Sequence, residues 1–495
     1  MVSNLPVVPV ALPMAAGALL ITMHRSPRLS RWVAVAANLL TLASSVILVH
    51  KVREAGVLVL TFGGWEAPFG IVFAVDMFSA LMVLVTMIVS TATLLFACCS
   101  LDGAREEMFF YPLFQFLLMG VNGSFLTGDL FNLFVWFEVL LISSYALMAL
   151  GSEGYQLQET FKYLVLNALS SSLFLVGIAL VYGATGTLNM ADIATKFSSL
   201  SDTGLGGVVA LIFMVVFGLK GGLFPLYMWL PRSYFGPPTV ISALFGGLLT
   251  KVGVYALFRL VSLMFAAHLD FVLPLLSFVA GATMFLGVLG ALSQWDFKRV
   301  LSYHIVSQIG YMIMGLALFT PVALAGAIFY IVHHILVKTS LFLVAAAVEK
   351  RRGTTHLTSL GGVMETAPVL TGLFLLAGLA LAGVPPLSGF VAKFMLVQAG
   401  LDQAAFTIVT VSVVVSFLTL FSMMKIFRYA FWSPVPEREE ITTGATARLV
   451  PVTLLVAAFV ILGLGGGGFM PYVDMAAEQL LDPSIYIAAV LRGAR

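Results

Sequence analysis

Charged side chains are scarce in this sequence. Only 10% of the 495 residues are Asp, Glu, Lys or Arg, whereas 60% are hydrophobic. A soluble globular protein carries about 25% charged residues. Because the scarcity extends along the whole chain, a single apolar anchor attached to a soluble domain does not explain it. The composition excludes a soluble protein, gives no sign of a nucleic-acid partner, and predicts a protein embedded in a lipid bilayer.

Cysteine is nearly absent, since the chain has only Cys98 and Cys99, which are adjacent at the end of an apolar run. Neighbouring cysteines rarely pair, and they hold a metal only with further ligands. The sequence also lacks nucleotide-binding and metal-ligand motifs, and no loop exceeds about 25 residues. We therefore expect no disulfide framework, no metal site and no large soluble domain.

Long apolar runs dominate what remains, and many contain 18 or more residues, enough to cross the bilayer core. They predict an all-α polytopic membrane protein of about fourteen transmembrane helices. These helices are placed near residues 5–23, 31–50, 77–99, 109–127, 130–150, 160–182, 206–224, 239–265, 270–292, 301–319, 322–347, 369–397, 405–431 and 447–467. The first basic residue, Arg25, follows the first apolar run instead of preceding it, so we expect no cleavable signal peptide.

Basic residues in the loops predict the orientation, because Lys and Arg concentrate on the cytoplasmic side. If the loop after the first helix is cytoplasmic, that side receives 14 Lys and Arg, and the opposite side receives 6, Arg259 among them. A miscounted helix in the middle would scramble this alternation. The distribution therefore favours an even helix count, with both termini on the non-cytoplasmic side.

Two pairs of segments indicate an internal repeat. FKYLVLNALSSSLFLV at 161–176 resembles FYIVHHILVKTSLFLV at 329–344, and FEVLLISSYALM at 137–148 more weakly resembles YHIVSQIGYMIM at 303–314. The offsets, 168 and 166 residues, nearly agree. The copies are five helices apart, an odd number, so they must be inverted in the membrane, as in many transporters. The predicted division is 1–107 with three helices, 108–267 and 268–432 with five helices each, and 433–495 with the last helix.

Glycine and proline interrupt predicted helices 7 and 12, at GLKGGLFPLYMWLP (218–231) and LALAGVPPLSGFVAK (379–393). Pro225, Pro385 and Pro386 break the helical hydrogen-bond ladder there. Freed backbone groups are tolerated inside a membrane only beside protein or water. Broken helices in corresponding halves indicate a transporter's working site, and a lysine lies close to each break.

Six ionisable residues lie in strongly apolar surroundings, and we call them the ionisable row. A charge at the bilayer centre costs about 2.5–3.5 kcal/mol, so a merely structural helix would carry leucine at these positions. The row therefore indicates a role in moving protons. Its members are Glu138, Lys220, Lys251, His334, Lys338 and Lys393.

Each member has a predicted part. An ion pair between Glu138 and Lys220 lowers the cost of burying both, and its separation would start or stop proton transfer. Lys251 has no adjacent carboxylate and is expected to exchange its proton readily. His334 and Lys338 stand four residues apart on one helix face, where histidine serves as a proton shuttle. Lys393 is the last buried base, while His333 is interpreted as a packing or secondary site.

These residues are the ones that a known family uses. The chain resembles, over nearly its whole length, the antiporter-like subunits shared by respiratory complex I and Mrp-type cation/proton antiporters. The stretches most similar to the D-type subunits of the Mrp complex are NLFVWFEVLLISSY (132–145), FPLYMWLPRSYFGPP (224–238), ALFGGLLTKVGVYALFR (243–259) and AGVPPLSGFVAKF (382–394). Residue 393 is lysine, whereas one complex I homologue has glutamate at the corresponding position.

The resemblance implies fourteen helices in inverted five-helix repeats. It implies a hetero-oligomeric complex of Mrp subunits in a bacterial plasma membrane that exchanges Na⁺ or Li⁺ for H⁺. No redox cofactor is expected, and the protein is expected to be a transporter subunit rather than an enzyme. Three alternatives stay open: a proton-pumping subunit of a complex I or hydrogenase-type respiratory complex, a scaffold that moves no protons, and a stand-alone solute carrier.

Overall fold

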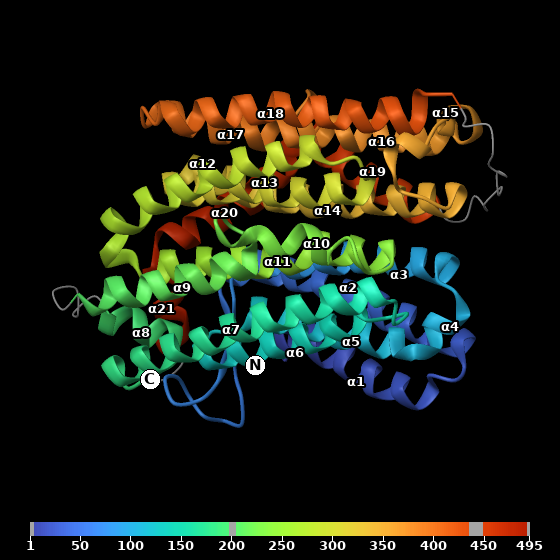
Figure 1. The fold of residues 1–495 in the computed structure, drawn as a ribbon. Coiled ribbons are helices and arrows are strands. Elements are labelled where there is room, and N and C mark those ends of the chain that lie inside the picture. Colours follow the sequence, from blue (N-terminus) through green and yellow to red (C-terminus); the bar gives the residue numbers. More distant parts are fainter. Residues whose placement is uncertain (1–3, 198–203, 435–448, 493–495) are drawn as a thin grey trace.

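The computed structural model describes residues 4–197, 204–434 and 449–492. Within these ranges, long helices lie side by side and nearly parallel or antiparallel (Figure 1). The first half contains α1 (Val8–Met23), α2 (Pro27–Ala55), α3 (Met77–Ser100), α4 (Gly103–Arg105), α5 (Tyr111–Leu126), α6 (Leu130–Met148), α7 (Gly154–Thr185), α8 (Met190–Phe197), α9 (Leu205–Gly221), α10 (Leu230–Ser233) and α11 (Thr239–Leu263). The second half contains α12 (Leu269–Ser293), α13 (Phe297–Leu318), α14 (Pro321–Arg352), α15 (Val363–Thr366), α16 (Pro368–Ala382), α17 (Ser388–Asp402), α18 (Phe406–Ile426), α19 (Leu449–Leu464), α20 (Gly466–Leu481) and α21 (Pro483–Arg492).

Shorter elements connect some of the helices. A two-stranded antiparallel hairpin, β1 (Leu58–Thr61) and β2 (Val72–Val75), lies between α2 and α3, with Leu58 opposite Val75. The short helical turns are η1 (Leu5–Val7), η2 (Glu106–Phe110), η4 (Leu226–Trp229), η5 (Ala266–His268), η6 (Leu357–Ser359) and η7 (Phe427–Trp432). The hairpin and these turns were not predicted.

Every predicted membrane helix has a counterpart among the described residues. Twelve helical segments are long and apolar enough to cross a membrane alone. The predicted helix at 369–397 is the interrupted pair α16 and α17. The last predicted helix corresponds to α19, although residues 447 and 448 lie outside the described part. The chain is therefore an all-α polytopic membrane protein, as predicted.

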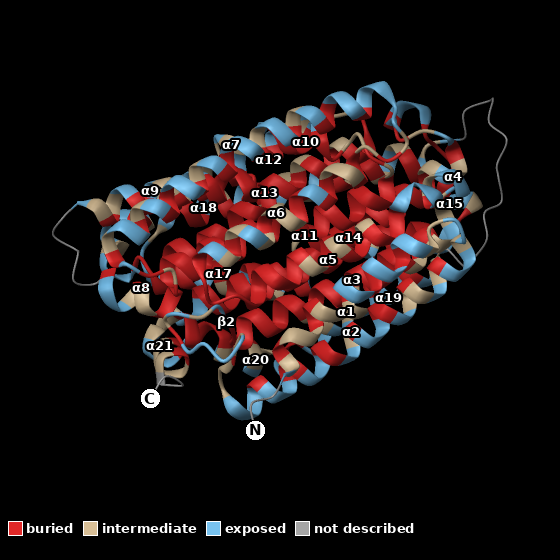
Figure 2. Cartoon of the chain, turned by 90° about the horizontal axis from the view of Figure 1, so that it is seen from below, coloured by how far each residue is buried: buried red, intermediate tan, exposed pale blue. Residues whose placement is uncertain are grey.

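Burial separates the helices into a central group and an outer group. All residues of α11 are buried, as is almost all of α13 and α14. Outer helices such as α2, α7 and α18 expose one apolar face (Figure 2). An apolar outer face suits lipid. The central helices α11 and α14 carry half of the ionisable row, namely Lys251, His334 and Lys338.

Two matching sets of hydrogen bonds recur at nearly the offset of the sequence repeat. Asp129 and Asp296, 167 residues apart, cap the first turns of α6 and α13 through the backbone N–H three residues on. Each also forms an isolated bridge, Asp129 with Asn189 and Asp296 with His356. One bridge lies just before α8 and the other a few residues before α15. These helices occupy opposite ends of the bundle (Figure 1), the arrangement that inverted copies require.

The C-terminal segment departs from the prediction of one spanning helix and a tail. After α19 the chain bends by 83° into α20 and continues as α21. The side-chain amide of Gln479 on α20 accepts a hydrogen bond of 2.8 Å from the Met77 N–H at the start of α3. The sequence did not reveal α20 because its apolar positions alternate with polar ones such as Asp474 and Glu478.

The assignment of Arg259 to a loop was wrong. It lies within α11, is 3% exposed, and forms an ion pair of 2.7 Å with Asp76. Its guanidinium also donates to the hydroxyls of Ser79 and Tyr255. An arginine beside the predicted end of a helix is tolerated inside because a buried carboxylate compensates its charge.

The two ends of the bundle differ in character. At the hairpin end, η1 and α21 both pack against the β1–β2 hairpin, so both termini of the described chain lie there. At the other end, here called the basic end, Arg105, Lys298 and Lys350 line one pocket. Both termini of the described chain thus lie at one end of the bundle, the arrangement that an even number of membrane crossings requires.

Close contact between α12 and α13 depends on glycine. A Cβ atom on Gly287 would lie 2.5 Å from the backbone nitrogen of Ser307, which cannot move without displacing α13. Gly281, on the same helix, has no described atom within 4 Å of its corresponding position. The two positions therefore form a matched pair.

Gly287→Ala is expected to lower the stability of the assembled protein by about 1–3 kcal/mol, because overpacking forces the helices apart. Gly281→Ala is expected to leave it unchanged or slightly higher, since alanine favours a helix. Thermal unfolding of the detergent-purified protein measures both. Equal melting temperatures for the two variants would contradict the close contact.

Candidate proton-transfer site

Lys220 lies in the last turn of α9, directly before the first helix break. Gly222 ends the helix in a left-handed conformation at φ 75°, and Pro225 follows. At the break, the Leu219 carbonyl accepts the Gly222 N–H at 3.2 Å and the Trp229 indole N–H at 3.0 Å. Because these two donors satisfy that carbonyl, the ammonium of Lys220, a residue only 5% exposed, is available for other partners.

Lys393 is bonded directly to the second break. Helix α16 ends at Ala382, Gly383 adopts φ 93°, and Pro385 and Pro386 follow. The Lys393 ammonium donates to the carbonyls of Leu381 and Ala382, each at 3.1 Å. Its third hydrogen bond, also 3.1 Å, goes to the Ser416 hydroxyl. A positive charge at a helix C-terminus is favourable, so the lysine stabilises the break that positions it.

The predicted direct ion pair between Glu138 and Lys220 is absent from the described residues, and a serine joins the two instead. The Ser171 hydroxyl donates to Glu138 at 2.5 Å, and Lys220 donates to the same hydroxyl at 3.2 Å. The Lys220 ammonium also lies 5.0 Å from the centre of the Phe137 ring. Glu138 is half-buried at the outer side of α6. The sequence could not show how α6 is rotated about its axis, so it could not show this position.

A small cavity adjoins Lys220 on the side of α11. Its volume is about 10 Å³, room for about one water molecule, and Asn167, Trp229 and Leu249 contribute to its lining. Leu249 lies two residues before Lys251 on α11. The cavity therefore lies between Lys220 and α11, the helix that carries Lys251.

Lys251 and Lys338 face each other across α11 and α14 without a carboxylate partner among the described residues. The Lys251 ammonium donates to the Gly246 carbonyl at 2.5 Å, and the Lys338 ammonium donates to the Leu301 carbonyl at 3.1 Å. Each is fully buried, and the charge of Lys251 acts on both Lys338 and His334. Like charges in a shared interior repel, so protonation of one lysine disfavours protonation of the other.

The two histidines of α14 differ in their surroundings. The Nδ1 atom of His333 lies 2.8 Å from the Ser388 hydroxyl at the start of α17, so His333 helps to fix the second break. Both ring nitrogens of His334 are buried without a hydrogen-bond partner in the part of the chain that the structure describes. An unpaired buried imidazole beside two lysines suits proton exchange better than structural support.

The row follows helices that pack in succession. Contacts run from α6 to α7, from α7 to α9, from α9 to α11, from α11 to α14 and from α14 to α17. Figure 1 shows these helices stacked across the molecule, from α6 and α7 on one side to α17 on the other. The order in space of the helices that carry the row therefore matches their order in the sequence, and these helices succeed one another across the bundle rather than along it.

Three buried polar residues of α13 were missed by the sequence reasoning: His304, Gln308 and Tyr311. His304 is fully buried, with its Nε2 atom 2.9 Å from the Ser422 hydroxyl. At the repeat offset of 166 residues, His304 is the counterpart of Glu138. The weaker repeat alignment thus contained the signal that could have identified it.

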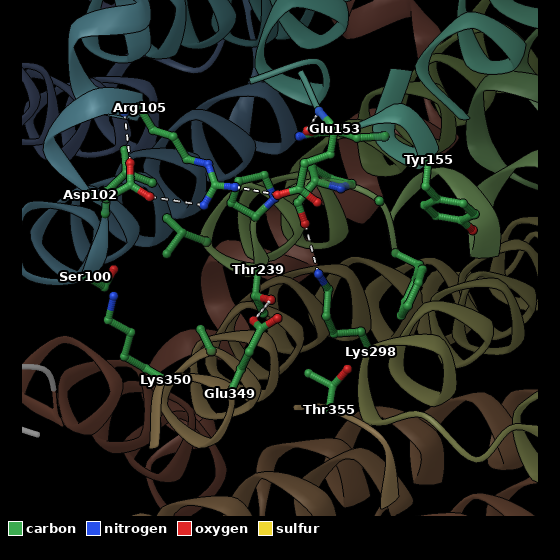
Figure 3. Close-up of a pocket in the computed structure, with 18 residues that line it drawn as sticks. Ser100, Asp102, Arg105, Glu153, Tyr155, Thr239, Lys298, Glu349, Lys350 and Thr355 are labelled. Carbon is green, nitrogen blue, oxygen red and sulfur yellow. Dashed lines mark hydrogen bonds and ion pairs between the residues drawn. The ribbon is translucent and has the colours of Figure 1, made fainter. Parts of the chain in front are cut away.

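A separate polar pocket of about 410 Å³ lies at the basic end (Figure 3). Arg105 forms ion pairs with Asp102 and Glu153, and the Thr239 hydroxyl donates to Glu349. Thr239 precedes Lys251 by 12 residues on α11, about 18 Å at the helical rise. The pocket therefore does not contact the row.

The two broken membrane helices and the buried lysines place the chain among multi-pass ion-transport proteins. Residues 127–419 match the family model described as "NADH:quinone oxidoreductase/Mrp antiporter, TM". The chain belongs to this family, which confirms the resemblance found in its sequence.

Full-length relatives narrow the comparison. The D-type Na⁺/H⁺ antiporter protein of Alkalihalophilus pseudofirmus is 50% identical over 491 residues, 99% of this chain and 100% of that protein. A chain of the Mrp complex from Dietzia sp. superposes with a TM-score of 0.92 at 34% identity, covering 99% of this chain and 100% of that one. A chain of the membrane-bound sulfane sulfur reductase, an archaeal respiratory complex, gives 0.89 at 29% identity with the same coverage.

Proposed function

We propose that this chain is the proton-translocating subunit of a multisubunit Na⁺(Li⁺)/H⁺ antiporter in a bacterial plasma membrane. The relatives named as antiporter components align with it from end to end. The observation that carries the proposal is the pair of lysines at the two helix breaks, joined by successive helices that bear Lys251, His334 and Lys338. Such a complex would use the proton-motive force to export sodium and regulate internal pH.

Ser171 makes the first step of the proposed path reversible. Its hydroxyl accepts a hydrogen bond from Lys220 and donates one to Glu138. When Lys220 loses a proton and Glu138 gains one, rotation of this O–H group lets both bonds re-form in the opposite direction. Glu138 is open to the outer face of α6, where a neighbouring subunit or a cation can act on its charge. A change at Glu138 therefore reaches Lys220 through a single hydroxyl and alters how firmly Lys220 holds its proton.

Repulsion drives the next steps. A proton arriving at Lys251 disfavours one on Lys338, so the lysines release protons in turn toward Lys393. The imidazole of His334, unpaired within the described ranges, lies one turn from Lys338 on α14, and its ring nitrogens can accept and return a proton. Backbone carbonyls hold both ammonium groups in place, which keeps the distances between them constant.

We also propose the division into 1–107, two inverted repeats at 108–267 and 268–432, and 433–495. The paired bridges of Asp129 and Asp296 support it, because they recur at opposite ends of the bundle. The orientation follows from the charges: the basic end is cytoplasmic, and both termini are outside.

The nearest alternative is a proton-pumping subunit of a respiratory complex such as complex I or a hydrogenase-type assembly. The archaeal respiratory relative shares the fold at lower identity, so the fold does not separate the two. Copurified proteins do: small membrane subunits support the antiporter, whereas iron–sulfur subunits would contradict it. Transport by the purified chain alone would instead make it a stand-alone carrier.

Lys220→Ala and Lys393→Ala are each expected to lower Na⁺/H⁺ exchange at least tenfold, because each removes a titratable group from the path. Exchange is measured in everted membrane vesicles, with assembly of the complex checked on native gels. Normal exchange in both assembled variants would overturn the proposal and favour a scaffold that moves no protons.

Ser171→Ala is expected to lower exchange several-fold, because it removes the hydroxyl that joins Glu138 to Lys220. Ser172→Ala is the matched control, since Ser172 is exposed and its hydroxyl donates to the Ala168 carbonyl of its own helix. The same vesicle assay compares the two. Equal rates would show that Glu138 and Lys220 do not depend on the serine.

A C-terminal alkaline phosphatase fusion is expected to be active, and a C-terminal green fluorescent protein fusion dark, because the C-terminus is proposed to be external. Fusions truncated after Ser100, which lies in the lining of the basic-end pocket, provide the control with the opposite result. A fluorescent full-length fusion would reverse the orientation.

A further inference from the structure

Polar side chains outside the ionisable row line the contact between α13 and α18. On α13 they are spaced four and three residues apart, and on α18 four, three and three, so each set lies on one helix face. We call this contact the α13–α18 seam. Its members are His304, Gln308 and Tyr311 on α13, and Ser412, Ser416, Thr419 and Ser422 on α18.

The seam consists of paired rungs in antiparallel register. Nε2 of His304 lies 2.9 Å from the Ser422 hydroxyl, and the Gln308 amide donates to Thr419 at 3.4 Å. Tyr311 and Ser416 share a hydrogen bond of 2.8 Å. Consecutive rungs are one helical turn apart, about 5 Å, a step that one water molecule or a rotating hydroxyl can bridge.

The seam begins at Lys393. Its ammonium donates to Ser416 at 3.1 Å and lies 4.4 Å from the centre of the Tyr311 ring. From there the rungs lead along α18 toward Lys425, one turn beyond Ser422. Lys425 is half-buried and donates to the carbonyls of Leu292 and Gln294 at the end of α12. Since α18 ends on this side, the seam runs from the second break to the basic end.

His304 is the member of the seam that can take up a proton, because one of its ring nitrogens, the buried Nδ1, has no hydrogen-bond partner among the described residues. The charged groups acting on it come from three helices: Lys338 on α14, Lys393 on α17 and Lys425 on α18. Lys338 donates to the Leu301 carbonyl one turn before His304 on α13, so the seam also adjoins the centre of the row.

Polar pairs also hold membrane helices together without moving protons. Such a structural role would explain any one of the hydrogen-bonded pairs between α13 and α18. It does not explain why the rungs are continuous with a buried lysine. Nor does it require an ionisable residue, since serine or glutamine would bond Ser422 equally well. His304 also occupies the repeat position of Glu138, the acid at the opposite side of the molecule.

We propose that the α13–α18 seam is a proton path between Lys393 and the basic end, with His304 as its relay. The inference rests on the proposed function, because Lys393 must carry a proton for the seam to move it. The seam gives Lys393 a connection to one membrane surface that does not pass through Lys220 or Lys251.

Thr419 allows the sharpest test, because valine has its shape without its hydroxyl. In everted vesicles, Thr419→Val and His304→Gln are expected to lower the maximal rate of Na⁺/H⁺ exchange at least tenfold at unchanged apparent KM for Na⁺. Thr419→Ser, which keeps the hydroxyl, is expected to retain exchange within twofold. Ser302→Ala is the control on α13, since Ser302 is fully buried but bonds to the Lys298 carbonyl of its own helix.

Native gels establish assembly of each variant. Exchange near the wild-type rate in assembled Thr419→Val and His304→Gln complexes would overturn the seam, and so would equal losses in Thr419→Val and Thr419→Ser. Lys393→Ala distinguishes a failure of the seam from a failure of the proposed function. If it abolishes exchange while the seam variants do not, only the seam is wrong, whereas normal exchange in Lys393→Ala contradicts the proposed function itself.

Discussion

A helix that stops inside a membrane leaves carbonyl groups that water cannot reach, and the two breaks of this protein meet that constraint differently. At the first, the neutral indole of Trp229 satisfies the Leu219 carbonyl, so Lys220 can lose a proton without exposing the helix end. At the second, Lys393 itself bonds the carbonyls of Leu381 and Ala382. A neutral amine retains two N–H groups for those carbonyls and can accept a hydrogen bond from Ser416, so this break also tolerates the loss of a proton.

At the centre of the molecule, no carboxylate within the described ranges pairs with Lys251 or Lys338. Lys251 and Lys338 donate to backbone carbonyls there, and both come from helices buried at nearly every residue. A carboxylate nearby would hold each charge firmly and slow its transfer. Carbonyl dipoles hold an ammonium in position more weakly, which favours exchange between neighbouring bases. The hydrogen bonds to backbone carbonyls therefore fix the positions of Lys251 and Lys338 and, at the same time, hold their charges only weakly.

The sequence predicted the helices, the two breaks and the ionisable row, because each leaves a mark against an apolar background. Lys220 and Lys393 are conspicuous where leucine would be cheaper to bury. Ser171 leaves no such mark, since serine is common in membrane helices and the rotation of a helix about its axis is set by packing. This is why the predicted Glu138–Lys220 ion pair was wrong, although both residues belong to one hydrogen-bonded group.

Three other features were also missed: the buried position of Arg259, the role of His304, and helix α20. Arg259 resembled a loop residue until Asp76, far away in the sequence, supplied its counter-charge. His304 is surrounded by Ser302, Ser307 and Gln308, so its neighbourhood did not look apolar enough to draw attention. Helix α20 was missed because it lies across other helices and needs no continuous apolar surface. Patterns of burial are visible in a sequence, whereas partners distant along the chain are not.

The position of α20 limits how this molecule can move. It packs against α3, α11 and α14, which belong to the proposed N-terminal segment and to each of the two proposed repeats. Gln479 bonds the start of α3, and Phe469 packs edge-on against Phe329 of α14. A rocking motion that opened one proposed repeat against the other would break these contacts. The contacts of α20 therefore favour a proton path in which charge shifts through a frame that stays closed.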